Sequence, residues 1–265
     1  MGILDRFRFD EGQVAVVTGA GRGIGRGCAL ALAEVGADVV CAARTEEQID
    51  ETASLVRALG RRALPVRCDV MERADLEALV TATMDEFGRV DVVVNNAGGW
   101  PPREALRTSE RSFEEAFRFN VTSAFLLTRL AVPPMVETAG GGSIVNISSR
   151  AGSMVLRGFA AYGTAKAALS WLTRELASEF APKVRVNAIE VGSVLTSALE
   201  YVAGDEAIKA EMESKTPMGR LGEVEDIAAA VVYLASPASS WVTGKVFQVD
   251  GGTEHPQLEV PTEPL

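Results

Sequence analysis

Residues 14–25 read VAVVTGAGRGIG, a valine-rich run that passes directly into a cluster of glycines. Valine-rich runs favour strands, and the apolar residues that follow, Ile24, Cys28 and Leu32, recur at the helical spacing of four. Glycines between a strand and a helix let the backbone approach a phosphate group closely, and the free amides at the helix start attract the anion. The stretch therefore predicts a strand, a nucleotide-binding turn and a helix that stops at Gly36.

The rest of the chain alternates short apolar runs with longer segments of helical period. The runs are valine-rich and mostly apolar on both faces, as a parallel sheet covered by helices on both sides requires. Seven runs, with glycine concentrated at the first turn, favour an open doubly wound sheet over an eight-stranded barrel. We expect an α/β, Rossmann-like fold with a seven-stranded parallel sheet flanked by helices on both faces, in one domain over residues 1–265. The expected strands are Val14–Thr18, Asp38–Ala43, Arg62–Arg67, Val90–Asn95, Ser143–Ser148, Val184–Ile189 and Val246–Val249.

Helical periodicity predicts a long helix over Phe113–Val136, which Pro133 and Pro134 should kink or end. Between residues 192 and 222 the alternation lapses, and an apolar insertion beside the expected crevice predicts a substrate lid; a surface helix pair packed on the body is the alternative. The proline-containing tail Thr253–Leu265 is expected to be extended, on a neighbouring subunit. Apolar residues of the insertion are Leu195, Leu199, Tyr201, Val202, Ile208, Met212 and Met218. The other expected helices are Glu46–Leu59, Asp75–Phe87, Tyr162–Phe180 and Glu223–Ala235.

The charge balance and the rarest residue types argue against several classes of protein. The chain has 26 Lys+Arg against 36 Asp+Glu, a net charge of −10, and its basic residues are scattered, so no nucleic-acid partner is expected. No apolar run reaches the ~18–20 residues of a membrane span, and residues 1–12 do not resemble a signal peptide, which predicts a cytoplasmic protein outside the membrane. Cys28, Cys41 and Cys68 are predicted to be buried free thiols. The single histidine, His255, argues against a Ser-His-Asp hydrolase, and no metal is expected.

The glycine turn is the first candidate site. Its spacing departs from the strict G-x-G-x-x-G fingerprint and no Gly-Lys-Ser/Thr follows it, so a merely tight turn is the alternative to a nucleotide site. Its residues predicted to bind a dinucleotide are Gly19, Gly21, Arg22, Gly23, Ile24 and Gly25.

The end of the second expected strand bears on which dinucleotide binds. An acidic residue ~20 residues past the glycines would bind the ribose hydroxyls of NAD, but Ala43 and Arg44 stand there. Arg44 and Arg22 could instead clamp a 2′-phosphate by charge-assisted hydrogen bonds, so we expect NADP, with NAD as the alternative. In that alternative Arg44 stacks on adenine and Glu46 or Glu47 touches the ribose. After the third strand, Asp69 and Val70 are expected at the adenine edge, although Asp69 could also be the N-cap of the next helix.

Four motifs follow one another in the chain at characteristic separations. They are Thr18-Gly19-x-x-x-Gly23-Ile24-Gly25, Asn95-Asn96-Ala97-Gly98, Ser149 thirteen residues before Tyr162, and Tyr162-x-x-x-Lys166. Through these motifs the chain resembles the short-chain dehydrogenase/reductase family over essentially its whole length, up to Asp250-Gly251-Gly252. Closer similarity is to the bacterial 7α-hydroxysteroid dehydrogenase and 3-oxoacyl carrier-protein reductase branch. It rests on Leu195-Thr196-x-Ala198-Leu199, Thr216-Pro217-x-x-Arg220-Leu221-Gly222 and Ser236-Pro237-Ala238-x-Ser240-Trp241.

Tyr162 and Lys166 carry the expected chemistry. Hydride transfer between an alcohol and nicotinamide needs a group that moves the hydroxyl proton, and without a usable histidine a tyrosine becomes the candidate. Its unperturbed pKa of about 10 is too high for a good base. Lys166 lies one helical turn on, so its ammonium is expected to favour the phenolate, and the positive helix start acts in the same direction. A Tyr–Lys pair on a solvated helix face is the alternative.

The resemblance implies roles for the remaining candidates. Lys166 would also hold the nicotinamide ribose, and Asn120 would support a water leading to Lys166. Ser149 would steady the substrate oxygen, with Ser148 as its competitor. The residues implied at the cofactor are Asn95, Asn96, Ala97 and Gly98 after the fourth strand, and Val191 and Thr196 at the nicotinamide amide.

One departure from the family pattern stands after the sixth strand. The family commonly has Pro-Gly there, whereas this chain reads Glu190-Val191-Gly192, so Glu190 either faces solvent or influences the pocket. The expected function is an oxidoreductase that interconverts a secondary alcohol and a ketone, with an apolar, steroid-sized substrate. Reduction of a 3-oxoacyl thioester and a non-catalytic nucleotide-binding regulator are the alternatives. The resemblance also implies a homotetramer through the helices Phe113–Val136 and Tyr162–Phe180.

Overall fold

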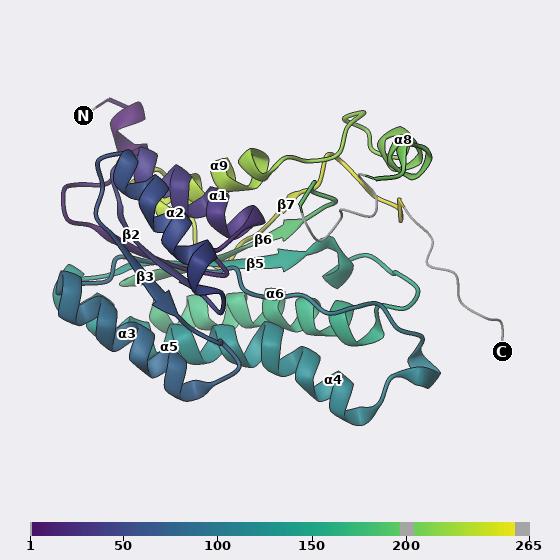
Figure 1. Cartoon of the computed structure of the whole chain (residues 1–265), viewed down its shortest axis with the longest axis horizontal. Coiled ribbons are helices and arrows are strands. Elements are labelled where there is room, and N and C mark those ends of the chain that lie inside the picture. Colours follow the sequence, from purple (N-terminus) through teal and green to yellow (C-terminus); the bar gives the residue numbers. More distant parts are fainter. Residues whose placement is uncertain (1, 197–203, 258–265) are drawn as a thin grey trace.

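A computed structural model describes residues 2–196 and 204–257 of the chain. Within these residues, seven strands form one sheet in the order β3-β2-β1-β4-β5-β6-β7, with neighbouring strands parallel (Figure 1). The order reverses between β1 and β4, and an open α/β sheet binds its ligand at such a switch point. The predicted doubly wound sheet is confirmed. The strands are β1 Val14–Thr18, β2 Asp38–Ala43, β3 Ala63–Arg67, β4 Val92–Asn95, β5 Gly142–Ser149, β6 Val184–Val191 and β7 Val246–Val249.

Helices cover both faces of the sheet, as Figure 1 shows. One face carries α1 Gly23–Glu34, α2 Glu46–Ala58 and α9 Val224–Ala235. The opposite face carries α3 Arg73–Phe87, α5 Ser123–Ala139 and α6 Ala160–Phe180. Two smaller helices, α4 Glu110–Phe117 and α8 Glu206–Ser214, lie toward the end of the sheet where the parallel strands terminate.

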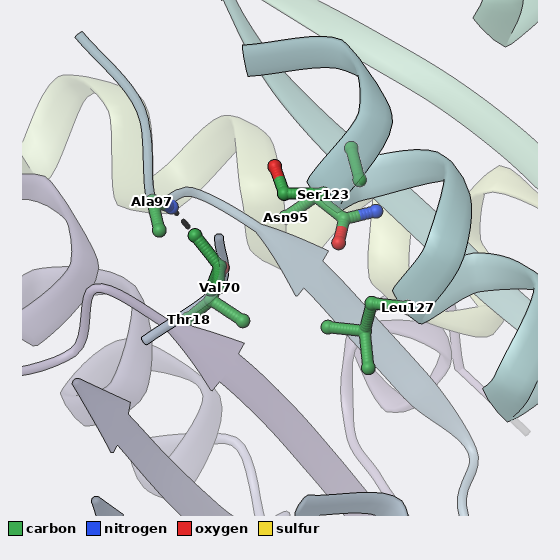
Figure 2. A pocket seen from close by; sticks show the side chains of 7 residues that line it. Thr18, Val70, Asn95, Ala97, Ser123 and Leu127 are labelled. Carbon is green, nitrogen blue, oxygen red and sulfur yellow. Dashed lines mark hydrogen bonds between the residues drawn. The ribbon is translucent and has the colours of Figure 1, made fainter. Parts of the chain in front are cut away.

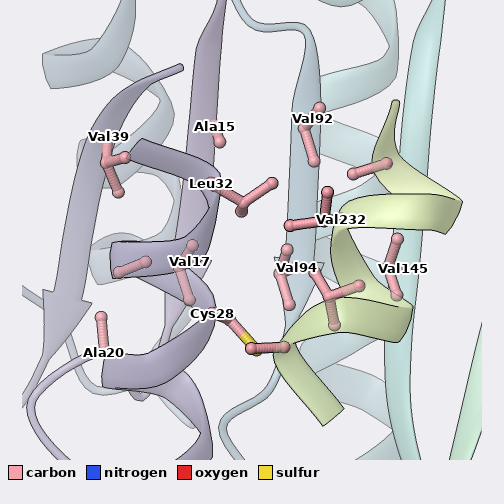
Figure 3. Packing of buried hydrophobic residues seen from close by; sticks show 14 of the residues in the cluster. Ala15, Val17, Ala20, Cys28, Leu32, Val39, Val92, Val94, Val145 and Val232 are labelled. Atoms are coloured by element: carbon pink, nitrogen blue, oxygen red, sulfur yellow. The ribbon is translucent and has the colours of Figure 1, made fainter. Parts of the chain in front are cut away.

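The strands alternate their side chains between two apolar cores. Ala15 and Val17 of β1 point into the core under α1 and α9, whereas Val14 and Val16 point into the core under α3, α5 and α6. In the first core Leu32 lies against the sheet and is fully buried (Figure 3). Complete burial of such a side chain stabilises the fold by roughly 1.5–3 kcal/mol. This two-sided packing explains why the strands read as nearly continuous apolar runs.

The predicted helix Phe113–Val136 is divided in the structure into α4, a π-helical segment η3 over Arg118–Thr122, and α5. Pro133 and Pro134 do not end α5, which continues to Ala139 and stops at the left-handed Gly140. Pro133 is exposed, so the carbonyl that lacks its donor can be hydrated, while buried Met135 holds the last turns on the sheet.

The predicted lid insertion contains one described helix, α8, whose Met212 packs on Leu221 and Leu195 in a small separate apolar cluster. Of the residues predicted to form the lid, Leu199, Tyr201 and Val202 lie outside the described residues. The described part of the C-terminal tail packs on its own chain: Ser193 donates a hydrogen bond of 2.5 Å to Gln257. The side-chain amide of Gln257 is buried and finds its partners beside α8. The expectation that the tail lies on a neighbouring subunit stays a prediction, because residues 258–265 lie outside the described residues.

Candidate active site

The turn between β1 and α1 is too crowded for side chains. A Cβ at Gly25 would lie 2.2 Å from the carbonyl oxygen of Gly19, and a Cβ at Gly19, where φ is +66°, would lie 2.7 Å from the Nδ2 atom of Asn96. Among the described residues no side chain caps the start of α1, so its amides are free to bind an anion. These crowded glycines, of which Gly19 and Gly23 adopt a positive φ, thus build a cradle that fits a pyrophosphate.

Thr18, the last residue of β1, is hydrogen-bonded to the backbone that follows β4, at the switch point of the sheet. Its hydroxyl oxygen accepts hydrogen bonds from the backbone N–H groups of Asn96 (3.0 Å) and Ala97 (3.1 Å), and the second of these bonds is visible in Figure 2. Asn96 also donates from its amide to the carbonyl of Thr18 at 2.8 Å. Asn95 does not line the cofactor cleft as expected: it is buried and donates to Asn146 and Thr128. It borders a small pocket behind Thr18 that has no room for a water molecule (Figure 2).

One cleft of about 880 Å³ runs from the glycine turn over the carboxyl ends of the strands to α8. It brings together most of the residues predicted at the cofactor and two of the predicted catalytic residues. Asn120 and Lys166 stand behind its wall, with 1% and 3% of their surfaces exposed. The predicted residues that line the cleft are Gly19, Gly21, Arg22, Gly23, Ile24, Gly25, Arg44, Asp69, Val70, Asn96, Ala97, Gly98, Ser149, Tyr162, Val191 and Thr196.

The end of the cleft beside β2 carries exposed cations. Arg22 and Arg44 line it, and neither forms an ion pair within the described part of the chain. Glu46 and Glu47 are exposed at the start of α2, and the α2 side chain at the cleft is Gln48, which the sequence interpretation missed. Asp69 is not the N-cap of α3; its carboxylate accepts from the N–H of Met71, and Glu72 occupies the N-cap position.

Tyr162 and Ser149 meet at the opposite end of the cleft. Tyr162 stands in the first turn of α6, and Ser149 is the last residue of β5. Burial raises the pKa of the Tyr162 hydroxyl above its ordinary value, and the hydrogen bond with Ser149 acts in the lowering direction. The predicted lowering by Lys166 is not found. The predicted direction of the Tyr162 pKa shift is wrong, because desolvation of the phenol outweighs the other influences on it.

Lys166 lies one turn beyond Tyr162 and points inward. Its Nζ atom donates a hydrogen bond of 2.8 Å to the carbonyl of Ile147 and lies 5.8 Å from the Tyr162 ring centroid. Burial lowers the pKa of Lys166 to about 7, because the protein interior disfavours its charged form. The lysine can therefore exchange its proton near neutral pH.

Asn120 comes from the π-helical segment, a local distortion that is frequent at functional sites. Its Oδ1 atom accepts from the N–H of Gly99 at 2.8 Å, and its Nδ2 atom donates to the carbonyls of Gly99 and Ala116. A Cβ at Gly98 would lie 2.8 Å from that Oδ1 and 2.9 Å from the Nζ atom of Lys166. The absence of a side chain at Gly98 thus allows Asn120 and Lys166 to converge on one point.

The two serines at the end of β5 differ in their partners. Ser148 is buried and its hydroxyl contacts the carbonyl of Lys166 and the hydroxyl of Ser170, each at 3.0 Å. Ser149 instead hydrogen-bonds Tyr162 in the cleft. The geometry favours Ser149 over Ser148 as the serine that contacts the substrate oxygen, as its thirteen-residue separation from Tyr162 predicts.

Glu190 does not face solvent, which was the first of the two expectations for it. The residue is buried, and its carboxylate accepts hydrogen bonds from Ser153 (2.7 Å) and Ser170 (3.0 Å) behind the cleft. Val191 and Thr196 still line the cleft, and the methyl group of Thr196 lies 3.5 Å from the Cβ position of Gly23. The sequence interpretation did not place Arg150, Thr253 and Gln257 at the cleft, because none of them belongs to one of the recognised motifs.

The thiols and the metal-binding residue types give the site no further chemistry. Cys28, Cys41 and Cys68 are free and buried as predicted, and burial raises the pKa of each thiol to about 12. Among the described residues, no group of histidine, cysteine, aspartate and glutamate side chains is arranged to hold a metal ion.

The chain is similar to several known proteins over nearly its whole length. A family model described as Enoyl-(Acyl carrier protein) reductase matches residues 19–254. The chain is 52% identical to an uncharacterised oxidoreductase of Mycobacterium tuberculosis (strain CDC 1551 / Oshkosh), over 99% of this chain and 100% of that protein. Its fold matches 7α-hydroxysteroid dehydrogenase complexed with NADH and 7-oxo glycochenodeoxycholic acid with a TM-score of 0.90 at 38% identity, over 96% and 98% of the chains. It matches a gluconate 5-dehydrogenase from Burkholderia cenocepacia J2315 in complex with NADP and tartrate with a TM-score of 0.88 at 32% identity, over 95% and 98%.

The chain therefore belongs to the short-chain dehydrogenase/reductase family, and the resemblance drawn from its motifs is confirmed. It is an oxidoreductase that uses a nicotinamide cofactor for hydride transfer between an alcohol and a ketone, with a small molecule as substrate. Its residues fit such a cofactor. The cradle at Gly19 and Gly25 has space for a pyrophosphate only without side chains, and the start of α1 together with the exposed Arg22 and Arg44 supplies positive potential.

Proposed function

We propose that this protein transfers a hydride between NADP(H) and a secondary alcohol or ketone whose body is apolar and about the size of a steroid. The hydrogen-bonded pair Ser149–Tyr162 in a cleft that begins at a phosphate cradle is the observation that carries this proposal. Residues 1–265 would act as one dinucleotide-binding catalytic domain, with the insertion 192–222 as its substrate lid.

The proton chemistry follows from the surroundings of Tyr162. The raised pKa keeps its hydroxyl protonated near neutral pH, so in the reducing direction Tyr162 gives its proton to the carbonyl oxygen. Ser149 donates its single hydroxyl proton in a hydrogen bond to the same carbonyl oxygen and so holds that oxygen beside Tyr162. A bound nicotinamide ring would supply or accept the hydride at the carbinol carbon.

In this proposal, Lys166 and Asn120 help to return a proton to Tyr162. With a pKa of about 7, Lys166 can release a proton at the pH where the enzyme works. Its Nζ atom and the Oδ1 atom of Asn120 converge at Gly98, which supports a water held between them and a route from the interior to Tyr162. Lys166 would also bind the nicotinamide ribose.

The preference for NADP rests on Arg22 and Arg44. Both are exposed in the cleft and unpaired within the described residues, and a guanidinium binds phosphate by paired, charge-assisted hydrogen bonds. In the described part of the chain, no carboxylate from the end of β2 or from α2 lines this end of the cleft, where Ala43, Arg44 and Gln48 stand instead.

The substrate end of the cleft is largely apolar, which supports an apolar substrate. Its polar contributions come from Thr253 and Gln257 on the far wall. The apolar side chains that line this end are Trp100, Met154, Leu156, Phe159 and Met212.

A panel of substrates tests the proposal. Purified protein should oxidise NADPH with steroid and bicyclic ketones and should be slow with 3-oxoacyl thioesters. Preference for the thioesters would replace the proposed substrate class by acyl-chain reduction, for which the description of the matching family model is the supporting observation. NADPH binding without turnover of either class would indicate a regulator, against which the intact Ser149, Tyr162 and Lys166 speak.

We also propose a cytoplasmic homotetramer with no nucleic-acid or membrane partner. Phe113, Phe125 and Trp171, on the helices predicted to form subunit contacts, are 38%, 38% and 59% exposed, which supports an apolar interface. Among the described residues the helical stretch Glu110–Ala139 is long and apolar enough to span a membrane, but its buried residues pack on the sheet as in a core helix. Light scattering measures the number of subunits.

A further inference from the structure

Three charged side chains are buried together next to Ser149. The side chains of Arg150, Glu190 and Asp250 are 8%, 6% and 9% exposed. Buried charges are costly unless they are paired and hydrogen-bonded. The contacts of these three side chains therefore indicate which segments they hold in place beside Ser149.

Arg150 joins three separate segments of the chain. Its Nε atom lies 2.7 Å from a carboxylate oxygen of Asp250, just after β7, and its Nη1 atom lies 3.8 Å from a carboxylate oxygen of Glu190, near the end of β6. The Nη2 atom donates a hydrogen bond of 2.9 Å to the carbonyl of Thr253 in the C-terminal segment, and the Glu254 carboxylate lies 3.8 Å from it. The guanidinium thus fastens the C-terminal segment to the residue that follows Ser149.

Glu190 extends the same network toward α6. Its carboxylate accepts the proton of Ser170, and a serine hydroxyl has only one proton to donate. Ser148 likewise donates its proton to the carbonyl of Lys166, and its hydroxyl oxygen lies 3.0 Å from that of Ser170. Glu190 accepts from Ser153 as well, and Ser153 in turn accepts from Arg150 at 2.8 Å. The pair Arg150–Glu190 consequently joins the helix of Lys166 to the end of β5.

The segment that Arg150 fastens forms one wall of the substrate end of the cleft. Thr253 and Gln257 both line this wall. Gln257 donates from its amide to the carbonyl of Met212 at 3.3 Å and to the hydroxyl of Thr216, so the wall is also bonded to α8 and the turn after it. A shift of the C-terminal segment would move this wall relative to Ser149.

We infer that Arg150, held between Glu190 and Asp250, is a positioning residue that sets the separation between Ser149 and the wall of Thr253 and Gln257, and so determines how tightly the substrate is bound. The inference rests on the proposed function, because it assigns the substrate to that end of the cleft. Arg150 belongs neither to the pair Ser149–Tyr162 nor to the proposed route through Lys166 and Asn120. It acts through the C-terminal segment that it holds.

The experiment compares Arg150→Met and Arg150→Lys with the control Arg185→Met. Arg185 is also largely buried and bonds carbonyls and Ser239 from β6, but at the end of the strand away from the cleft. For Arg150→Met we expect the KM for the ketone to rise about 10- to 100-fold, with a much smaller change in kcat and an unchanged Kd for NADPH. Arg150→Lys should restore only part of the loss, because an ammonium cannot bridge the same acceptors. The control should lower Tm and leave the KM unchanged.

A second readout does not need turnover. Amide hydrogen exchange of residues 250–257 should become faster in Arg150→Met, while exchange in β1 and α1 stays as in the wild type. Unchanged KM and unchanged exchange in 250–257 would overturn the inference, as would an equal loss of kcat, NADPH binding and protection throughout the chain. If the wild type reduces no ketone, the proposed function has failed, and the exchange of residues 250–257 alone decides whether Arg150 positions the wall.

Discussion

Gly98→Ala is the substitution that disturbs the candidate proton route with the smallest change in the chain. The new methyl group would lie 2.8 Å from the Oδ1 atom of Asn120 and 2.9 Å from the Nζ atom of Lys166. Ordinary contacts are ~3.5 Å or longer, so Oδ1 must retreat by about 0.7 Å and Nζ by about 0.6 Å. Both atoms are held by hydrogen bonds, Asn120 to Gly99 and Lys166 to Ile147, and these bonds would lengthen or break.

We expect this variant to lose about 10- to 100-fold in kcat, because misplacement by a fraction of an ångström to one ångström costs that much in a positioned site. Overpacking should destabilise the fold by only about 1–3 kcal/mol, so the protein remains folded. The assay measures kcat, the Kd for NADPH and the free energy of unfolding in parallel.

Gly27→Ala is the matched control for Gly98→Ala. Its added methyl group would lie 2.1 Å from a methyl group of Val224, between α1 and α9 and outside the residues that line the cleft. Stability is expected to change in this control while kcat stays the same. If Gly98→Ala kept the wild-type kcat, the convergence of Asn120 and Lys166 would have no part in turnover and the reasoning would be refuted.

Further predictions concern the cofactor, the titration of Lys166 and the core. Arg44→Ala should weaken NADPH binding about tenfold or more and leave the Kd for NADH nearly unchanged, since only the 2′-phosphate contact is lost; equal weakening of both would contradict the NADP assignment. The folded pKa of Lys166, about 7, lies below its ordinary value of 10.5, so between these values the unfolded chain binds more protons and stability rises with pH. Urea midpoints measured from about pH 7 to 8.5 should therefore rise more steeply for the wild type than for Lys166→Met, and parallel curves would refute the burial effect. Leu32→Ala, at a fully buried position between α1 and the sheet, should lower the free energy of unfolding by about 2–5 kcal/mol in denaturant titrations, and a loss below that range would mean that the core refills the cavity.

The sheet was predictable because its inner strands are buried on both faces and are therefore mostly apolar. The strand β1, for example, has the predicted bounds Val14–Thr18, and β6 differs only in running two residues further, to Val191. The glycine turn was predictable because backbone crowding leaves no other residue type for Gly25. Local sequence carries both kinds of information.

The parts that escaped prediction depend on tertiary surroundings. The sequence interpretation predicted one continuous helix over Phe113–Val136 and did not identify the π-helical segment at Asn120. The direction of the Tyr162 pKa shift is decided by burial, which the spacing of Tyr162 and Lys166 does not report. Buried partners for Glu190 could have been predicted from the sequence, because a carboxylate inside a buried strand requires them. That its partners include Arg150 and Ser170, far apart in the chain, became visible only in the fold.

The most direct test of the account is the single-turnover rate of ketone reduction by Tyr162→Phe loaded with NADPH. We predict that this variant binds NADPH with nearly the wild-type Kd, since the aromatic ring remains, and that the rate falls by a factor of about 10² to 10⁴ because the proton donor is gone. A rate equal to that of the wild type, with NADPH bound and the ketone reduced, would contradict the assignment of Tyr162 as the group that moves the proton.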